Sequence, residues 1–264
     1  MRTIRTIDEL RAALAGAGSI GLVPTMGALH AGHLSLFEAA RAENDTVVAS
    51  LFVNPAQFGD RADLAAYPRD EERDAGLAAE AGVDLLFAPP LEEMYPAGFQ
   101  TWVEVEEASA GLEGDARPGH FRAVATVCLK LFNIVRPERA YFGQKDAQQA
   151  VVIRRLVRDL DVQLEIRVLP TVRDADGLAL SSRNVLLSPD ERAQAVSLPR
   201  ALAAGAGAHR LGGDAVAAAV AELNGLTPDY VELLDLDGAL VLAGAVRVGS
   251  IRLIDNVLLK GELR

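Results

Sequence analysis

The stretch that decides the fold reads Pro24-Thr25-Met26-Gly27-Ala28-Leu29-His30-Ala31-Gly32-His33. It follows an apolar run at 19–23, which predicts a short buried strand, and it precedes a segment at 34–42 whose apolar periodicity predicts a helix. The two histidines therefore fall where a strand-to-helix connection opens a helix toward solvent. Proteins that alternate strands and helices bind ligands at such positions.

The spacing of His30 and His33 favours a phosphate site. Residues three apart lie on one face of a helix, so the two imidazoles share that face. Gly32 lacks a Cβ and lets a phosphate approach the backbone, where the N–H groups of the first turn have no helical partner. Such a pair also occurs as ordinary polar residues at a helix start. The preceding strand, the Pro-Thr turn and the flanking glycines favour the functional interpretation.

Composition and charge narrow the class of protein. The chain has 264 residues, of which 50% are hydrophobic and 24% charged, as in an ordinary globular protein. The length fits one large domain or a main domain with a smaller second one. No apolar run reaches the ~20 residues of a membrane span, and no signal peptide is evident, so we expect a cytoplasmic protein. The net charge of −11 argues against a general nucleic-acid surface.

Two rare residue types suggest where chemistry lies. Cys128 is the single cysteine, and its apolar helical surroundings predict a small core residue rather than a nucleophile. Only three of the 26 basic residues are lysines. Lys130 and Lys260 fit solvated or helix-side roles, whereas Lys145 stands in a strand-to-helix turn, where a compact charge can meet phosphate oxygens.

Strand and helix patterns alternate along most of the chain. A capping box at Thr6 and Glu9 predicts a first helix ending near residue 17. Alternation predicts a parallel sheet with covering helices. The expected strands lie near 20–23, 46–53, 84–88, 139–142 and 163–169, and the expected helices near 34–43, 70–81, 121–135 and 147–159.

A second start signal marks the expected domain boundary. Ser188-Pro189-Asp190-Glu191 combines an N-cap, an N1 proline and an N3 glutamate, which predicts a helix running to about residue 206. After it come Ala/Gly-rich helical stretches, including one near 214–223, and strand patterns at 229–235, 241–248 and 251–254. These predict a small α+β domain.

Polar side chains follow several of the strands. Asn54 and Gln57 come after the strand at 46–53, where carboxamides can orient a small polar substrate, although a simple Asn-Pro turn explains Asn54 equally well. The mixed charges at 70–74 favour a solvated helix face.

Two further segments contain side chains that can bind phosphate groups. Gly143-Gln144-Lys145-Asp146 repeats the strand, turn and helix pattern, and Asp146 also fits an N-cap. Gln149 follows three residues after Asp146, on the same face. Ser181, Ser182 and Arg183 put two hydroxyls and a guanidinium in a row, a pattern that is more usual in a surface loop.

Taken in order, these motifs resemble the pantoate–β-alanine ligase family of the wider H-x-G-H nucleotidyltransferase superfamily. The resemblance covers essentially the whole chain. It rests on Pro-Thr-Met-Gly-Ala-Leu-His-x-Gly-His, Phe-Val-Asn-Pro-x-Gln-Phe, Tyr-Pro-Arg, Arg-Pro-Gly-His-Phe-Arg, Phe-Gly-x-Lys-Asp, Ser-Ser-Arg-Asn and the terminal Arg-Leu-Ile-Asp-Asn.

The resemblance implies a fold and an activity. The fold is α/β: a Rossmann-like parallel sheet with helices on both faces, plus a smaller C-terminal α+β domain. Residues 1–187 are expected to form the catalytic domain that binds ATP and pantoate, and 188–264 a domain covering the active site. The reaction joins D-pantoate to β-alanine with ATP and Mg²⁺, through a pantoyl-adenylate, releasing AMP and diphosphate in pantothenate biosynthesis. The family is typically homodimeric.

The resemblance also assigns roles to residues. His30, His33 and Lys145 are expected to be catalytic, with His33 as proton donor. Asn54 and Gln57 lie near β-alanine, while Gln57, Gln149 and Met26 bind pantoate. The expected ATP contacts are Met26, Gly27, His30, Gly32, His33, Gly143, Gln144, Lys145, Asp146, Val172, Leu180, Ser181, Ser182 and Arg183.

Three positions depart from the family pattern or extend it. Leu180 stands where most members have methionine, and its backbone and apolar contacts with adenosine should survive the exchange. Arg73 stands where the magnesium-binding segment is often acidic, which leaves Asp74 as the expected metal ligand. Arg117 and His120 belong to a segment that resembles a mobile cover loop.

Two alternatives stay open on the residues alone. One is another H-x-G-H enzyme that leaves the nucleotide on its product, and the other is a nucleotide-sensing module without turnover. Neither needs the amides at 54, 57 and 149, so these amides favour the ligase.

Overall fold

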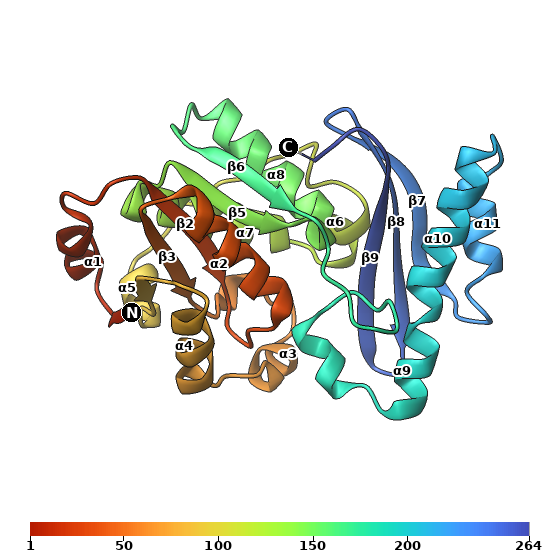
Figure 1. The fold of residues 1–264 in the computed structure, drawn as a ribbon, viewed down its shortest axis with the longest axis horizontal. Coiled ribbons are helices and arrows are strands. Elements are labelled where there is room, and N and C mark those ends of the chain that lie inside the picture. Colours follow the sequence, from red (N-terminus) through yellow and green to blue (C-terminus); the bar gives the residue numbers. More distant parts are fainter. Residues whose placement is uncertain (264) are drawn as a thin grey trace. The chain divides into compact units, whose positions relative to one another are not determined.

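The computed structural model describes residues 1–263 and divides into two compact units (Figure 1). Unit 1 comprises Met1–Phe142 and Gln148–Leu169, and unit 2 comprises Gly143–Ala147 and Pro170–Arg264.

A six-stranded parallel sheet forms the centre of unit 1, in the order β1–β4–β3–β2–β5–β6. Figure 1 labels β3, β2, β5 and β6 among these strands. The strands are β1 (Arg2–Ile4), β2 (Ile20–Thr25), β3 (Thr46–Leu51), β4 (Leu85–Phe87), β5 (Arg139–Gly143) and β6 (Glu165–Leu169). The order changes direction between β2 and β5, which pair in parallel. Parallel sheets bind ligands beyond the carboxyl ends of the strands at such a point.

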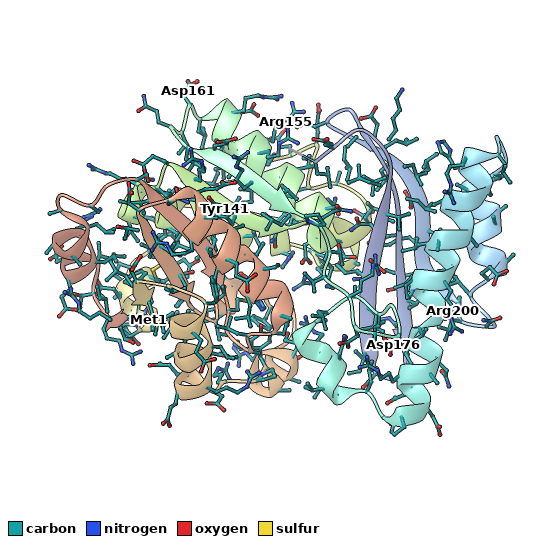
Figure 2. All side chains as sticks on the ribbon, in the orientation of Figure 1. Met1, Tyr141, Arg155, Asp161, Asp176 and Arg200 are labelled. Carbon is teal, nitrogen blue, oxygen red and sulfur yellow. The ribbon has the colours of Figure 1, made fainter. Side chains whose placement is uncertain are left out.

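Helices cover both faces of this sheet. They are α1 (Ile7–Leu14), α2 (Ala31–Glu43), η1 (Pro55–Gln57), α3 (Arg61–Ala66), α4 (Glu71–Glu80), α5 (Leu91–Met94), α6 (Leu112–Ala116), α7 (His120–Val135) and α8 (Ala147–Asp159). Alternate strand residues point to opposite faces. Leu22 of β2 joins a core cluster with α1, α7 and α8, whereas Val23 joins a second cluster with α2 and α4. Tyr141 of β5, labelled in Figure 2, belongs to that second cluster.

Unit 2 contains a three-stranded antiparallel sheet, β7 (Pro228–Leu236), β8 (Ala239–Val248) and β9 (Ile251–Lys260), with helices α9 (Pro189–Ala195), α10 (Ser197–Arg210) and α11 (Ala215–Ala221). Two short 3₁₀ turns, η2 (Gln144–Asp146) and η3 (Ser182–Leu186), also belong to it. Its core joins helix and strand residues such as Leu198, Leu202, Leu242 and Val246. The α/β sheet with a smaller α+β part confirms the predicted fold class.

Both predicted capping boxes are present, at Thr6 with Glu9 and at Ser188 with Glu191. The helix predicted from 188 to 206 is wrong in one respect, because it is broken into α9 and α10. Pro199 lies in the first turn of α10; it has no N–H to bond residue 195, whereas a first turn tolerates it.

Several of the shortest helices and strands were not predicted from the sequence. Strand β1 has three residues, of which only Ile4 is buried, so it shows no period. Helices α3, α5 and α6 are similarly too short for a periodic signal. Strand β9 extends to Lys260, beyond the predicted end at 254, because it pairs with β8 over that length.

After residue 169 the chain leaves unit 1, and everything from residue 170 on belongs to unit 2. The sequence instead predicts a domain boundary between 187 and 188. Arg192 of α9 pairs with Asp174 and with Asp176, a residue labelled in Figure 2. These pairs tie residues before 188 to unit 2. The catalytic and covering roles given to 1–187 and 188–264 stay predictions.

Within residues 1–263, no helix has the length and apolar character needed to cross a membrane.

Candidate active site

His30 and His33 lie at the start of α2, where the sequence placed them. His30 is the N-cap, and its Nδ1 accepts the Gly32 N–H at 3.1 Å, while Nδ1 of His33 accepts the His30 N–H at 3.3 Å. The ring centroids are 4.2 Å apart. Because both Nδ1 atoms accept, the hydrogen-bond network assigns the proton of each neutral ring to Nε2. An Nε2–H group is a donor suited to a phosphate oxygen.

The turn before these histidines adopts an unusual backbone. Gly27 and Ala28 have φ angles of +83° and +52°, in the left-handed region. A Cβ on Gly27 would lie 2.8 Å from Asp74 Oδ2 and 2.8 Å from Leu51 Cδ1. Glycine is therefore required at position 27 both by its backbone angle and by the space around it.

Asp74 of α4 does not lie on a solvated face, so that part of the sequence interpretation is wrong. Its side chain is 1% exposed, and its two oxygens accept the N–H groups of Ala28 at 2.7 Å and Leu29 at 2.8 Å. Residues 70–73 of the same charge run are exposed, as expected. The burial of Asp74 could not be predicted from the charge pattern, because the four charged residues before it are exposed.

Met26, Asn54 and Gln57 form a connected polar group in unit 1. Asn54 Nδ2 donates to Gln57 Oε1 at 3.1 Å, and Gln57 Nε2 lies 2.9 Å from Met26 Sδ. Asn54 also caps η1 by accepting the Ala56 N–H at 3.3 Å. The Asn-Pro turn and the amide pair are thus the same structure, and the two sequence interpretations do not compete.

Two residues of the expected cover loop hold the backbone of Gln57. His120 Nδ1 lies 3.1 Å from Gln57 O, to which Arg117 Nη2 also donates at 3.3 Å. Because a carbonyl can only accept, Nδ1 of His120 carries the proton, and its Nε2 accepts from Arg117 Nη1 at 3.1 Å. The sequence offered no signal for this contact, which joins residues about 60 positions apart. Mobility of the segment stays a prediction.

Gln149 lies in the first turns of α8 and is partly buried. Within residues 1–263 no hydrogen bond connects it to Met26, Asn54 or Gln57, so its placement beside pantoate stays a prediction. The preceding Gln148 is buried and was missed: its Oε1 accepts the Glu113 N–H at 3.1 Å, and its Nε2 donates to carbonyls at 108, 110 and 111. Gln148 thereby fixes the loop before α6.

In unit 2, Lys145 lies in η2, a turn fastened by Asn256 of β9. Asn256 Nδ2 donates to Gln144 O and to Lys145 O, each at 2.9 Å, and Gln144 Nε2 returns a bond to Asn256 Oδ1 at 3.2 Å. Asn256 is 2% exposed. The sequence predicts no role for the terminal Arg-Leu-Ile-Asp-Asn motif, and the structure shows that its asparagine holds the lysine turn.

The predicted Ser-Ser-Arg segment forms a second loop of unit 2. Leu180 N–H donates to Val172 O at 3.0 Å, and Ser181 caps η3 by accepting the Arg183 N–H at 3.3 Å. Nearby, Arg173 donates two bonds to the buried carboxylate of Asp255, at 2.6 and 2.9 Å. This paired geometry anchors the loop to β9.

Cys128 and Lys130 lie on α7. Cys128 is buried in the core, as predicted, and burial raises the pKa of its thiol to about 12, so it is no nucleophile near neutral pH. Lys130 is partly buried on α7, within the solvated or helix-side range expected for it, and it packs on aromatic rings. Its Nζ lies 5.0 Å from the ring centroid of Phe99 and 6.0 Å from that of Tyr95, and burial lowers the pKa of its ammonium.

Comparison with known proteins identifies the family of the chain. A family model described as Pantoate-beta-alanine ligase matches residues 2–258. A pantothenate synthetase of Moorella thermoacetica is 54% identical, over 98% of this chain and 99% of the relative. One from Roseiflexus castenholzii is 55% identical, over 98% of this chain and all of the relative.

Solved structures give the same result. A pantothenate synthetase from Thermus thermophilus is 50% identical and superposes with a TM-score of 0.95, covering 99% of this chain and 100% of that one. A pantoate–β-alanine ligase from Francisella tularensis, complexed with β,γ-ATP and β-alanine, is 35% identical with a TM-score of 0.86 over the full length of both chains. The chain belongs to the pantoate–β-alanine ligase family.

Proposed function

We propose that this chain is an AMP-forming ligase that condenses D-pantoate with β-alanine to give pantothenate, AMP and diphosphate. The observation that carries the proposal is the pair of imidazoles at the start of α2, both with Nδ1 engaged by backbone N–H groups. The neighbouring group of Met26, Asn54 and Gln57 supports it, since nucleotide binding alone does not need two carboxamides.

The first step of the proposed reaction forms an adenylate. A carboxylate oxygen of pantoate bonds to the α-phosphorus of ATP, and the bond from that phosphorus to the bridging oxygen breaks, with its electron pair leaving on diphosphate. His30 and His33 stabilise the developing charge through Nε2–H donors, with His33 in the proton-donor role. Removing one such donor typically costs about 10² to 10³ in rate.

The second step uses the adenylate as an acyl donor. The neutral amine of β-alanine bonds to the acyl carbon, the bond from that carbon to the phosphate oxygen breaks, and AMP leaves with the electron pair while the amine releases a proton. Asn54 and Gln57 orient β-alanine, and Gln57, Gln149 and Met26 hold pantoate. The carbonyl of Gln57 already accepts from Arg117 and lies within bonding distance of His120, which supports a pre-positioned glutamine.

The proposal assigns ATP contacts within each unit. In unit 1 they are Met26, Gly27, His30, Gly32 and His33. In unit 2 they are Gly143, Gln144, Lys145, Asp146, Val172, Leu180, Ser181, Ser182 and Arg183. The backbone of Lys145 held by Asn256 supports its catalytic role, because a fixed turn places the ammonium reproducibly.

The carboxylate of Asp74, the expected metal ligand, does not fit a magnesium site. Both oxygens of Asp74 hold backbone N–H groups, and Arg73 Nη1 lies 3.3 Å from Oδ1, so a cation there would displace donors and face a guanidinium. Within residues 1–263 no group of three His, Cys, Asp or Glu residues is arranged for a metal. We propose instead that Mg²⁺ enters bound to the phosphates of ATP, as part of the substrate.

Isotope exchange tests the function. With ATP, Mg²⁺ and D-pantoate, the purified protein should exchange labelled diphosphate into ATP, and adding β-alanine should release AMP and pantothenate. His33→Ala should lower both rates by about 10² to 10³, whereas His209→Ala, a histidine of α10, serves as the matched control. A folded sample without pantoate-dependent exchange refutes the ligase. A product that retains AMP would indicate the nucleotidyltransferase, and ATP binding without turnover the sensor.

We also propose that the protein forms a homodimer and that it is located in the cytoplasm. The first follows from the family resemblance and the second from the composition of the sequence. Sedimentation of the purified protein, and fractionation of the cells that produce it, test the two separately.

A further inference from the structure

A buried carboxylate outside the proposed reaction touches the turn that carries both histidines. Asp74 lies on α4, and its two oxygens accept the N–H groups of Ala28 and Leu29, at 2.7 and 2.8 Å. Those amides belong to the two residues immediately before His30. The carboxylate is 1% exposed and therefore keeps its bonds away from competing water.

The turn itself needs an external anchor. Gly27 and Ala28 both have positive φ angles, and an L-residue such as Ala28 is strained in that region. Strained backbone persists only where its surroundings hold it in place. A carboxylate has acceptors on both oxygens, so one Asp can bind two successive N–H groups and maintain this conformation.

Arg73 adds a second contact to the same turn. Its Nη2 donates to Leu29 O at 3.0 Å, and its Nη1 to Asp74 Oδ1 at 3.3 Å. Leu29 is therefore held at both its N–H and its C=O by neighbouring residues of one helix. Because His30 follows directly, the direction in which α2 begins depends on these contacts of Asp74 and Arg73 with residues 28 and 29, which we call the clamp.

We propose that Asp74 is a positioning residue, which holds the turn at 26–29 so that His30 and His33 meet the reacting phosphate. This inference rests on the proposed function. It replaces the metal-ligand role expected from the sequence, because the oxygens of Asp74 are already engaged with backbone donors.

The test compares Asp74→Asn with Asp70→Asn. Both remove one carboxylate from the same helix, but Asp70 is the exposed N-cap and asparagine caps as well as aspartate. In Asp74→Asn the amide nitrogen faces a backbone N–H, so the turn shifts. Since a misplacement of about 1 Å can cost 10²-fold, we expect kcat to fall about 10- to 100-fold. In Asp70→Asn kcat should stay within about twofold.

Two readouts separate positioning from metal binding and from general destabilisation. Amide hydrogen exchange at Ala28 and Leu29 should accelerate at least about tenfold in Asp74→Asn and not in Asp70→Asn, since a lost hydrogen bond exposes the amide. The Mg²⁺ concentration for half-maximal rate should stay unchanged, and excess Mg²⁺ should not restore the rate. A folded Asp74→Asn protein with kcat within about threefold of wild type, or with rate restored by Mg²⁺, overturns the proposal.

Wild-type measurements keep the inference testable if Asp74→Asn does not fold. The amides of Ala28 and Leu29 should then exchange as slowly as those in the interior of α2, and exchange at the rate of exposed loop amides refutes the clamp. If the wild-type protein lacks pantoate-dependent exchange, the proposed function fails while the amide measurement still decides whether the clamp exists.

Discussion

Two strand-to-helix turns of this protein are held by opposite chemistry. The turn at 26–29 in unit 1 is fastened by the carboxylate of Asp74, which accepts two backbone N–H groups. The η2 turn in unit 2 is fastened by the carboxamide of Asn256, which donates to two backbone carbonyls. A carboxylate has no proton to donate at neutral pH, whereas a carboxamide has two. Whether a turn presents N–H groups or carbonyl groups to its neighbour therefore decides which side chain can anchor it.

The difference also matters for charge. Asp74 brings a negative charge to the turn that precedes α2, where Arg73 lies close to it. Asn256 is neutral, so the anchor of the lysine turn does not itself offset the charge of Lys145. The neighbouring carboxylate of Asp255 is instead paired with Arg173. The lysine that we propose to bind phosphates is thus supported by a residue that does not compete for its charge.

The largest expected effect removes the cation and leaves its turn intact. Lys145→Ala should lower kcat by about 10² to 10³, roughly 3 to 4 kcal/mol, because the charge that we propose to face the phosphates is lost while Asn256 still holds the backbone. Steady-state kinetics measure the loss, and thermal unfolding checks the fold. Lys260→Ala, at the exposed end of β9, is the matched control. A Lys145→Ala protein within about threefold of wild type would contradict the role given to the lysine.

The next effect compares the glycines of the two turns. Gly27→Ala forces an L-residue to φ +83° and brings its Cβ within 2.8 Å of Asp74 Oδ2. Left-handed backbone costs roughly 1 to 2 kcal/mol, and overpacking about 1 to 3 kcal/mol. Each kcal/mol lowers Tm by about 2 to 4 °C at this size.

Gly143→Ala is the control for that measurement. Gly143 has φ −92° and nothing within 4 Å of an added Cβ, so its Tm should hold or rise slightly. Differential scanning calorimetry of both variants gives the answer. Equal Tm values would mean that the turn at 26–29 is not held as tightly as its contacts indicate.

The smallest effect reverses the anchor of the lysine turn. Asn256→Asp replaces a donor by an acceptor opposite two carbonyls, and an unsatisfied buried group costs about 1 to 3 kcal/mol. We expect a higher KM for ATP and a lower Tm. Asn224→Asp, the same change at an exposed position, should alter neither. If Asn256→Asp matched wild type in both quantities, Asn256 would not position Lys145.

Local signals in the sequence predicted the parts of the molecule that depend on a few neighbouring residues. The capping boxes at Thr6 and Ser188 rely on contacts three residues apart, and both are present. The His30 and His33 spacing likewise gave the start of α2. The start signal at Ser188 predicts one helix to about residue 206, and it carries no information about the break at Val196, which Pro199 in the first turn of α10 accompanies.

Contacts between distant residues could not be predicted in this way. Asp74 is 45 residues from Leu29. The charges around it predict a surface residue, and the family resemblance predicts a metal ligand. Asn256 is 112 residues from Gln144. Nothing in the residues near either position shows which backbone groups they meet.

By itself the sequence determined the alternation of strands and helices, the family resemblance and the turn that carries the two histidines, since periodicity, capping and motif order act over short distances. Only the tertiary structure decided that an aspartate holds one turn and an asparagine the other. Such pairings depend on where α4 and β9 pack, and packing brings together residues that are far apart along the chain.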